Sequence, residues 1–475
     1  MQKPIRTRIA PSPTGNLHLG TARSALFNYL FAKRYEGVFV LRVEDTDLER
    51  SKKEYEQNII DGLNWLGIKW DEGPDPQNPK KYLGDFGPYR QAERDYQPHL
   101  QRLLDENKAF FCYHSKEELE AEKENQLKNK EPQRHLCSHF ATGRPAGTNE
   151  PGIIRLKIDP QKIKFKDLIR GEIEFDTALL GDFSIAKDQK TPLYNFAVVV
   201  DDAEMSISHV IRGEDHISNT PKQILICRAL GFEAPEFAHL PLLLGPDRSK
   251  LSKRHGATSV WEFKEQGYLP QAMINFMALL GWSAGNNQEI FSFKELAEEF
   301  SLEKVGKSGA VVNIEKLNSL NSYYLKQMPA EELRARAGIA ASVPPKIIFL
   351  AQERASTLNE VSSGVAAMME EPNYEKSLLF WKDNPEEKIK EMLEISQKII
   401  SQIDEEVFLE DKIQENLMEE ANKVGDRGLL LWPLRVALSG KKQSPPPFVL
   451  AEIWGKEKTL TRIGQAIKKL ETSSQ

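Results

Sequence analysis

Strand-type and helix-type hydrophobic patterns alternate at the start of the chain. Residues 7–10 predict a short strand, which a proline- and glycine-rich turn over residues 11–15 ends. A helix with one buried face follows, because apolar residues recur at helical spacing at Ala22, Ala25, Leu26, Tyr29 and Leu30. The branched apolar run at residues 38–43 is typical of a buried parallel strand. This order predicts the opening of a nucleotide-binding α/β sheet.

The pattern changes twice further along the chain. Residues 91–191 resemble an insertion, with a polar helical stretch at 116–130 and strands around 153–158. The branched run at 196–200 predicts a strand that resumes the main sheet. Beyond about residue 260 strand signals become rare and helical spacing dominates. We therefore expect an α/β region followed by an all-α region.

Composition narrows the class of protein. The chain has 475 residues, of which 40% are hydrophobic and 28% charged, which excludes a collagen-like or wholly disordered chain. Its apolar runs are too short for a membrane span, and the N-terminus lacks a signal-peptide pattern. Three cysteines cannot form a disulfide framework, so we expect a cytoplasmic protein without a membrane partner. The net charge of −6 permits a local basic groove but not a chain that coats nucleic acid throughout.

A glycine-containing loop at residues 11–21 lies between the first strand and the first helix. Gly15 and Gly20 allow close backbone approach, and a helix that starts at Thr21 offers free N–H groups to a phosphate. His18 would project into the same crevice. A solvated glycine/proline turn is the alternative interpretation, because a lone glycine-rich loop is a weak signal.

A basic loop at residues 250–254 follows the apolar segment 240–248. Lys250 and Lys253 could close over a triphosphate and neutralise the charge that builds up on it. Taken alone, the pentapeptide is more often an ordinary basic surface loop, because such loops are common.

Together and in this order, the two loops resemble the "HIGH" and "KMSKS" signatures of class I aminoacyl-tRNA synthetases. Five further segments resemble bacterial glutamyl-tRNA synthetases: residues 8–15, 41–47, 87–94, 194–202 and 210–215. Thr21 stands where the first signature has its second histidine, and the second signature reads Lys-Leu-Ser-Lys-Arg; both variants are usual in the glutamyl branch. The resemblance covers residues 5–320 well and the C-terminus more loosely.

The resemblance implies a Rossmann-like parallel sheet with an α+β connective insertion, followed by an all-α anticodon-binding region. The regions expected are a catalytic domain (1–90 and 192–243), an insertion that binds the tRNA acceptor end (91–191), a stem-contact region with the basic loop (244–325) and a helical anticodon-binding domain (326–475).

The family reaction joins glutamate to ATP as glutamyl-adenylate and then transfers it to the terminal ribose of tRNA-Glu. The resemblance assigns the glutamate site to Arg8, Ser12, Glu44, Tyr194, Val198 and Arg212. The planar fork of an arginine suits a carboxylate, so Arg8 and Arg212 would read the two carboxylates and Glu44 the ammonium group. A salt bridge within residues 42–47 is the alternative role for Glu44.

The same resemblance assigns the ATP site to His18, Gly20, Asp215, Leu243 and Lys253, with His18, Lys250 and Lys253 catalytic. Mg²⁺ would accompany ATP, held largely by phosphate oxygens and water. Arg354 matches a position that reads an anticodon base, although a surface helix arginine is an equal alternative. The family implies a monomer that takes part in protein biosynthesis.

Rival functions stay open. A glutaminyl-tRNA synthetase would have a β-rich C-terminal domain, and a truncated glutamyl-queuosine enzyme would lack the helical C-terminus. A catalytically dead tRNA-binding paralogue would have no reason to keep His18, Glu44, Arg212 and Lys253 together. The sequence does not decide whether tRNA-Gln is charged as well.

A zinc site is the last candidate. Cys112, His114, Cys137 and His139 form two C-x-H pairs, which could close a tetrahedral structural shell. His135 is a possible substitute ligand, and a surface knot with reduced thiols is the alternative. Such an ion would pin the insertion and take no part in the chemistry.

Overall fold

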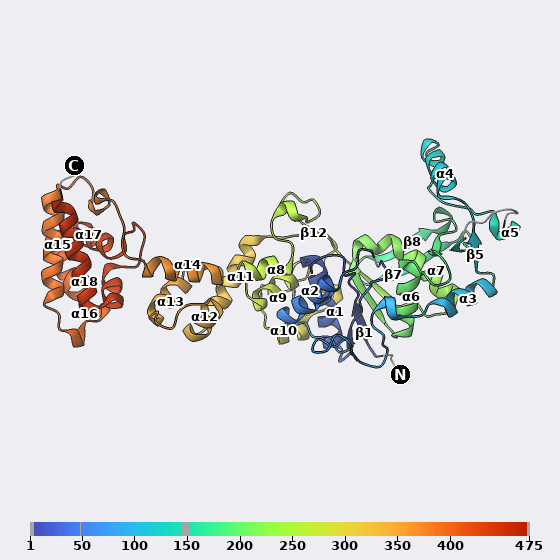
Figure 1. Ribbon diagram of the computed structural model, residues 1–475, viewed down its shortest axis with the longest axis horizontal. Helices are drawn as coiled ribbons and strands as arrows, with labels where there is room; N and C mark the ends of the chain where they lie inside the picture. The colour runs from blue at the N-terminus through green and yellow to red at the C-terminus, as the bar shows by residue number, and fades with distance from the viewer. Residues whose placement is uncertain (1–3, 48, 145–151, 473–475) are drawn as a thin grey trace. The chain divides into compact units, whose positions relative to one another are not determined.

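The computed structural model divides the chain into two units, Met1–Asn321 and Ser322–Gln475, which are described separately. It describes all residues except 1–3, 48, 145–151 and 473–475, and the side chain of Lys253. Figure 1 follows the chain by colour from the N-terminus to the C-terminus.

A six-stranded sheet forms the centre of the first unit. In spatial order its strands are β2 (Val38–Leu41), β1 (Arg6–Ile9), β10 (His209–Gly213), β11 (Glu236–Leu240), β7 (Lys162–Asp167) and β8 (Gly171–Asp176). Neighbouring strands from β2 to β7 are parallel, and only the β7–β8 hairpin pairs antiparallel. The mixed sheet with its parallel centre confirms the Rossmann-like class.

Three helices accompany the strands of this sheet: α1 (Leu19–Arg34), α6 (Tyr194–Glu204) and α7 (Thr220–Leu230). Helix α1 packs against β1, β2 and β10, and α6 packs against α7. The strand expected at residues 196–200 is wrong, because this run lies inside α6. Every residue of the run is buried, so no polar position marks its period, and burial overrides the β preference of valine.

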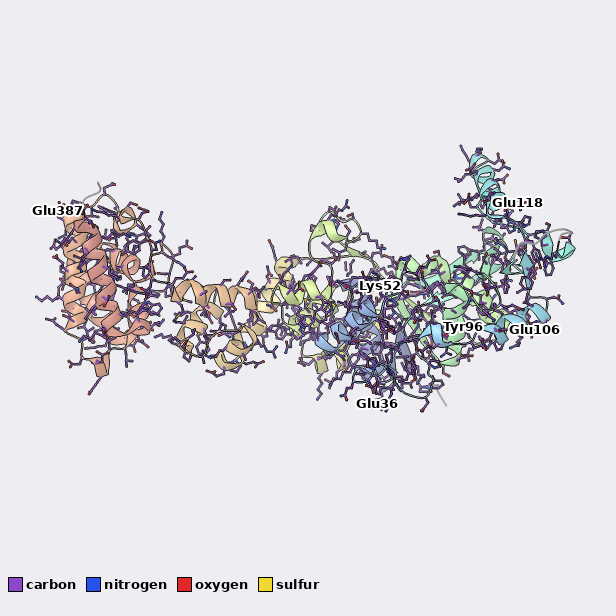
Figure 2. All side chains as sticks on the ribbon, in the orientation of Figure 1. Glu36, Lys52, Tyr96, Glu106, Glu118 and Glu387 are labelled. Atoms are coloured by element: carbon purple, nitrogen blue, oxygen red, sulfur yellow. The ribbon has the colours of Figure 1, made fainter. Side chains whose placement is uncertain are left out.

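The segment expected as an insertion contributes to two sheets. The antiparallel strands β5 (Ala109–Cys112), β6 (Ile153–Leu156) and β9 (Ser184–Ala186) form a sheet of their own, whereas β7 and β8 extend the main sheet. Helix α4 (Lys116–Lys128) projects from the end of the unit that carries β5 (Figure 1). It buries none of its residues, and Glu118 at its start closes a capping box with Ser115 (Figure 2).

Shorter elements complete the first unit. They are α2 (Lys53–Leu66), β3 (Gly73–Pro74), β4 (Tyr82–Leu83), α3 (Gln97–Asp105), α5 (His139–Thr142), β12 (Leu243–Leu244), α8 (Val260–Glu265), α9 (Pro270–Leu279), α10 (Phe293–Glu299), β13 (Ala310–Val311) and α11 (Ile314–Lys326), which continues past the boundary. Strands β12 and β13 pair with each other and so hold the start of the basic loop.

The regular elements described in the second unit are helical, as expected. They are α12 (Ala330–Arg336), α13 (Pro345–Gln352), α14 (Leu358–Met369), α15 (Glu386–Ser401), α16 (Glu410–Val424), α17 (Arg427–Ser439) and α18 (Pro447–Glu471). The last four share a core that includes Leu393, Leu417, Leu434 and Ile463. Within the described part of the chain, we find no helix with the length and apolar character that crossing a bilayer requires.

Candidate active site

A cavity of about 940 Å³ opens at the carboxyl ends of β1, β10 and β11. In parallel α/β sheets this is the edge where ligands bind. Of the residues expected from the sequence, the cavity brings together Arg8, Ser12, His18, Gly20, Glu44, Tyr194, Arg212, Asp215, Leu243 and Lys250. These residues come from segments far apart in the chain, so the cavity brings together the residues expected to bind glutamate and those expected to bind ATP.

Two expected residues do not line this cavity in the described structure. Val198 is 1% exposed and lies in the core with Phe196, because its side of α6 faces the protein interior. Lys253 begins the short 3₁₀ helix η4 (Lys253–His255), but its side chain lies outside the described structure.

His18 caps helix α1, which begins at Leu19, two residues before the expected start. Its Nδ1 accepts a hydrogen bond from the backbone N–H of Thr21 at 3.3 Å. A Cβ at position 20 would lie 3.1 Å from the His18 ring, so Gly20 leaves room for that ring. Desolvation by burial, followed by the charge of Lys250, lowers the pKa of His18. A neutral imidazole therefore stands at a helix N-terminus, where free N–H groups attract phosphate.

Buried ion pairs among Arg8, Arg42, Glu44 and Asp202 form another part of the cavity wall and its support. Arg8 Nε lies 3.1 Å from Asp202 Oδ1, and Arg42 Nη1 lies 2.6 Å from the same oxygen. Arg42 Nη2 also contacts Glu44 Oε1 at 3.1 Å, so Glu44 both lines the cavity and forms the local salt bridge considered as its alternative role. Burial acts to raise the pKa of Asp202, but Arg8 and Arg42 outweigh it and the net shift is downward. Asp202 is therefore a carboxylate that fixes both guanidinium groups.

Arg212 has one unused donor. Its Nε donates to His239 Nε2 at 3.2 Å and its Nη2 donates to Thr220 Oγ1 at 2.8 Å. Nη1 is buried and has no hydrogen-bond partner among the described residues. Burial lowers the pKa of Arg212 to about 10, so the group stays charged at neutral pH. A buried donor without a partner costs about 1–3 kcal/mol, and an anionic ligand in the cavity would recover that energy.

Some functional candidates were missed by reasoning from the sequence. Arg42 is 0% exposed and joins Asp202 to Glu44, and His216 lines the cavity beside Tyr194. Desolvation, and then the charge of Arg212, lowers the pKa of His216 to about 4. The one signal for Asp202 was an acidic pair directly after the branched run at 196–200. Charged residues inside an apolar segment are buried only when they are paired.

The basic loop meets the cavity through exposed groups. Lys250 Nζ lies 3.4 Å from Asp215 Oδ2, and the two side chains are 66% and 49% exposed. A Cβ at position 245 would come within 2.8 Å of the His255 ring, so Gly245 lets the loop turn back on itself. Lys250 therefore lines the part of the cavity near His18 without being locked in place.

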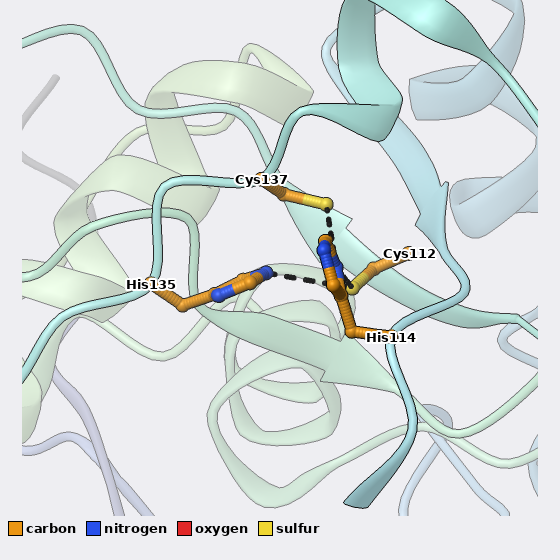
Figure 3. Close-up of side chains that lie close together, drawn as sticks. All are labelled: Cys112, His114, His135 and Cys137. Atoms are coloured by element: carbon orange, nitrogen blue, oxygen red, sulfur yellow. Dashed lines mark hydrogen bonds between the residues drawn. The ribbon is translucent and has the colours of Figure 1, made fainter. Parts of the chain in front are cut away.

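A cluster of cysteine and histidine side chains lies apart from the cavity, near β5 (Figure 3). Cys112, His114, His135 and Cys137 each present one ligand atom, and these atoms lie within 4.8 Å of one another. His135 takes the fourth place, whereas the Nδ1 of His139 accepts the backbone N–H of Tyr113 at 3.1 Å. The structure therefore groups the alternative histidine, His135, with the other three.

Three distances between sulfur and nitrogen atoms in this cluster match those expected around a tetrahedral zinc ion. Cys112 Sγ lies 3.4 Å from His114 Nδ1 and 3.6 Å from His135 Nε2, and Cys137 Sγ lies 3.6 Å from His114 Nδ1. Zinc–sulfur and zinc–nitrogen bonds of usual length predict an S···N edge of roughly 3.6 Å. Burial opposes ionisation of Cys112, but hydrogen bonds from His135 and His114 lower its pKa to about 4. Burial and the neighbouring Cys112 raise the pKa of Cys137 to about 12.

Arg354 lies in the second unit, beside a separate cavity of about 330 Å³. Residues of α13, α14 and α17 line this cavity, together with Lys441 and the segment 443–445. Arg354 is exposed there, as a residue that meets an external ligand must be.

Two known families match the chain. The family described as "tRNA synthetases class I (E and Q), catalytic domain" matches residues 4–319. The family described as "Anticodon binding domain" matches residues 293–467.

Full-length relatives and solved structures are also similar. "Glutamate--tRNA ligase 1" of Syntrophomonas wolfei is 42% identical over 488 residues, covering 98% of this chain and 96% of the relative. "Glutamate--tRNA ligase" of Carboxydothermus hydrogenoformans is 42% identical over 490 residues, covering 97% and 99%. The crystal structure of a glutamate tRNA ligase from Elizabethkingia meningosepticum in complex with its amino acid has a TM-score of 0.87 at 33% identity, covering 98% of this chain and 100% of that one.

Proposed function

The chain belongs to the glutamate–tRNA ligase family of class I aminoacyl-tRNA synthetases, and from that premise we propose how its cavity works. L-Glutamate and ATP react there to form glutamyl-adenylate and pyrophosphate, and the glutamyl group then passes to the terminal ribose of tRNA-Glu. No side chain needs to form a covalent intermediate, so the site acts by positioning and by charge stabilisation.

The unused Nη1 of Arg212, next to a second buried arginine, is the observation that carries the glutamate assignment. Arg8 and Arg212 read the two carboxylates of the substrate, and Ser12 and Tyr194 line the pocket around them. Glu44 binds the ammonium group; burial raises the pKa of Glu44, and a cationic ligand beside it would favour its charged form.

ATP occupies the other end of the cavity in this proposal. Its phosphates meet His18, Gly20 and the N-terminus of α1, while Asp215 and the backbone of Leu243 contact the adenosine. A Mg²⁺ ion bound with ATP would be held largely by phosphate oxygens and water and would neutralise charge at the phosphates. Lys250 and Lys253 then neutralise the charge that grows on the leaving pyrophosphate.

The tRNA contacts are assigned to two regions. The segment 91–191, with its projecting helix α4, meets the acceptor end, and Arg354 reads an anticodon base beside its own cavity. Phosphate contacts set the register and unstacked bases are read individually. We further propose a monomer in the cytoplasm, where the free thiols of Cys112, Cys137 and Cys227 would stay reduced.

A structural zinc ion fits the Cys/His cluster. We assign its ligands as Cys112, His114, His135 and Cys137, because their donor atoms lie within 4.8 Å of one another and three of the S···N distances are 3.4–3.6 Å. Glu122 Oε2 lies 2.5 Å from His135 Nδ1, the outer contact that orients a metal-binding histidine. Four protein ligands leave no open position, so such an ion would hold the insertion together and perform no chemistry.

Metal analysis separates the two candidate ligand sets. Protein purified without chelators should contain one zinc per chain, and His135→Ala should lose it. The matched control His139→Ala should keep it, and cobalt substitution should give an intense tetrahedral spectrum in the parent and in the control but not in His135→Ala. Zinc well below one per chain, with Cys137→Ser as stable as the parent, would exclude the site.

Aminoacylation tests the proposed function directly. The full chain is assayed with purified tRNA-Glu and tRNA-Gln, each with glutamate and with glutamine. Glutamyl-tRNA-Glu is the expected product, and glutamyl-tRNA-Gln as a second product would identify a non-discriminating enzyme. Charging with glutamine, or no charging by the folded protein, would refute the assignment.

A further inference from the structure

Three adjacent strands bring a histidine and an aspartate next to Arg212. Arg212 on β10 is in register with His239 on β11, and Asp167 ends β7 on the far side of β11. His239 is 0% exposed and Asp167 is 1% exposed. The chain separates His239 from Arg212 by 27 residues and from Asp167 by 72, so only the folded sheet unites them.

Every described hydrogen-bonding neighbour of the Asp167 carboxylate is a donor. Oδ1 accepts the backbone N–H groups of Ile169 at 3.0 Å and Arg170 at 2.7 Å. Oδ2 accepts the backbone N–H of His239 at 3.1 Å and faces its ring Nδ1 at 2.6 Å. Asp167 is therefore ionised, and the hydrogen-bond network assigns the ring proton of His239 to Nδ1.

That tautomer turns the other ring nitrogen into an acceptor. With the proton on Nδ1, His239 Nε2 presents a lone pair to Arg212 Nε–H at 3.2 Å. Thr220 holds a second edge of the guanidinium group, since its Oγ1 accepts from Arg212 Nη2 at 2.8 Å. The same oxygen lies 3.1 Å from His239 Nε2 and 3.3 Å from the carbonyl oxygen of His216. Arg212 is thereby fixed at two nitrogens, and Nη1 is the one left for a ligand.

We propose that Asp167, His239 and Thr220 are positioning residues that hold Arg212 as a fixed donor toward a substrate carboxylate. This inference rests on the proposed function. A fixed guanidinium donor suits the side-chain carboxylate of glutamate, in which both oxygens accept, better than the amide of glutamine, in which only one oxygen accepts and the N–H₂ group is itself a donor. Without these three residues, the Arg212 side chain could turn away from the substrate. Both the affinity for glutamate and the discrimination against glutamine would then fall.

Two variants of similar shape at position 239 test the hydrogen-bond acceptor that His239 Nε2 offers to Arg212. His239→Gln keeps an oxygen that can accept from Arg212, whereas His239→Met fills the space without one. With saturating tRNA-Glu, His239→Met should raise the KM for glutamate about tenfold and lower the preference for glutamate over glutamine by a similar factor. His239→Gln should stay within about threefold of the parent, and the KM for ATP should be unchanged in both.

His209→Met is the matched control. His209 is also a buried histidine of the same sheet, 8% exposed on β10, but it contacts Ser208 and Phe31 instead of Arg212. Its substitution should lower the melting temperature without changing the KM for glutamate. If His239→Met does not fold, Thr220→Val replaces it, with an expected rise of about threefold or more in the same KM.

Parallel measurement of Arg212→Ala separates this inference from the proposed function. If that variant keeps the parental KM for glutamate, the proposed glutamate site is wrong. If Arg212→Ala raises the KM but a folded His239→Met, or Thr220→Val in its place, does not, only the positioning role fails. Equal rises in His239→Gln and His239→Met would also overturn it.

Discussion

The two ends of the cavity hold their charges in opposite ways. At the end proposed for the amino acid, Arg8, Arg42 and Asp202 are buried and paired at 2.6–3.1 Å. At the end proposed for ATP, Lys250 and Asp215 are 3.4 Å apart and largely exposed. Buried pairs are costly to break, whereas exposed pairs contribute little and exchange partners freely.

This difference matches what each end must recognise. Choosing between glutamate and similar amino acids requires donors that cannot rearrange for the wrong ligand. Charge on the phosphates, in contrast, grows during the reaction, and cations that are free to approach can stabilise it as it develops. In this proposal, one end of the cavity recognises the amino acid with charged groups that are fixed by burial. The other end meets the phosphates with charged groups that are free to move.

Removing the central cation of the buried ion pairs should have the largest effect on stability. Arg42→Met leaves Asp202, Asp201 and Glu44 buried without their shared cation. Removing one partner of a buried pair costs about 3–5 kcal/mol of unfolding free energy, which urea titration measures. A loss below about 1 kcal/mol would show that water or nearby side chains replace the guanidinium group.

The same network makes the stability of the fold depend on pH, and the shifted pKa of Asp202 gives the direction. The pKa of Asp202 in the folded protein is below its ordinary value, so its ionisation stabilises the fold above about pH 4. That contribution disappears as the pH falls through the folded pKa. Asp202→Asn should therefore be less stable than the parent at neutral pH, and the difference should narrow toward acid pH in parallel urea titrations.

Arg212→Ala removes the ligand-facing donor of the end proposed for the amino acid. A charge-assisted pair worth about 1.5–3 kcal/mol is lost, so kcat/KM for glutamate should fall tenfold or more. ATP binding, measured by titration without glutamate, should change little because the two ends are separate. Parallel losses for both substrates would show that the cavity does not divide in this way.

Lys253→Ala tests the end proposed for ATP. The rate of adenylate formation in single-turnover assays should fall by roughly tenfold or more, while ground-state ATP affinity falls less, because the opposing charge grows in the transition state. Lys253→Arg keeps the charge and serves as the control. Equal losses in rate and affinity would identify a simple binding lysine.

The smallest effect is expected from the exposed pair itself. Asp215→Asn removes the partner of Lys250, yet an exposed pair contributes about 0–1 kcal/mol, so thermal stability should change by only a degree or two. High salt should erase even this difference. A loss comparable to that of Arg42→Met would mean that the loop is locked and that the contrast between the two ends is wrong.

Local patterns predicted much of the fold. Residues 7–10, 38–43 and 116–130 matched their elements closely because each pattern depends on neighbouring residues. The fully buried run at 196–200 failed because it has no polar position to reveal a helical period. The sequence motifs predicted that His18 and Arg212 share one site, and both residues line the cavity.

The partners of those residues could not be predicted locally. Asp202 and Asp167 act on residues 194 and 72 positions away, through contacts that exist only after the sheet assembles. His135 joins the Cys/His cluster in place of His139, although His139 Nδ1 also lies 3.5 Å from Cys137 Sγ, so the C-x-H spacing alone could not identify the fourth member. The partners of the motif residues are therefore determined by contacts between distant segments, which the motifs do not reveal.

The pairing of the β7–β8 hairpin with β11 has a consequence for protein engineering. A graft that exchanged residues 91–191 between two relatives would appear to move a self-contained module. It would also carry away Asp167, which fixes the tautomer of His239 beside Arg212. A swap meant to alter tRNA preference would then change amino-acid fidelity as well. Chimeras should keep β7 and β8 with the recipient sheet and exchange only the segment between β5 and β6.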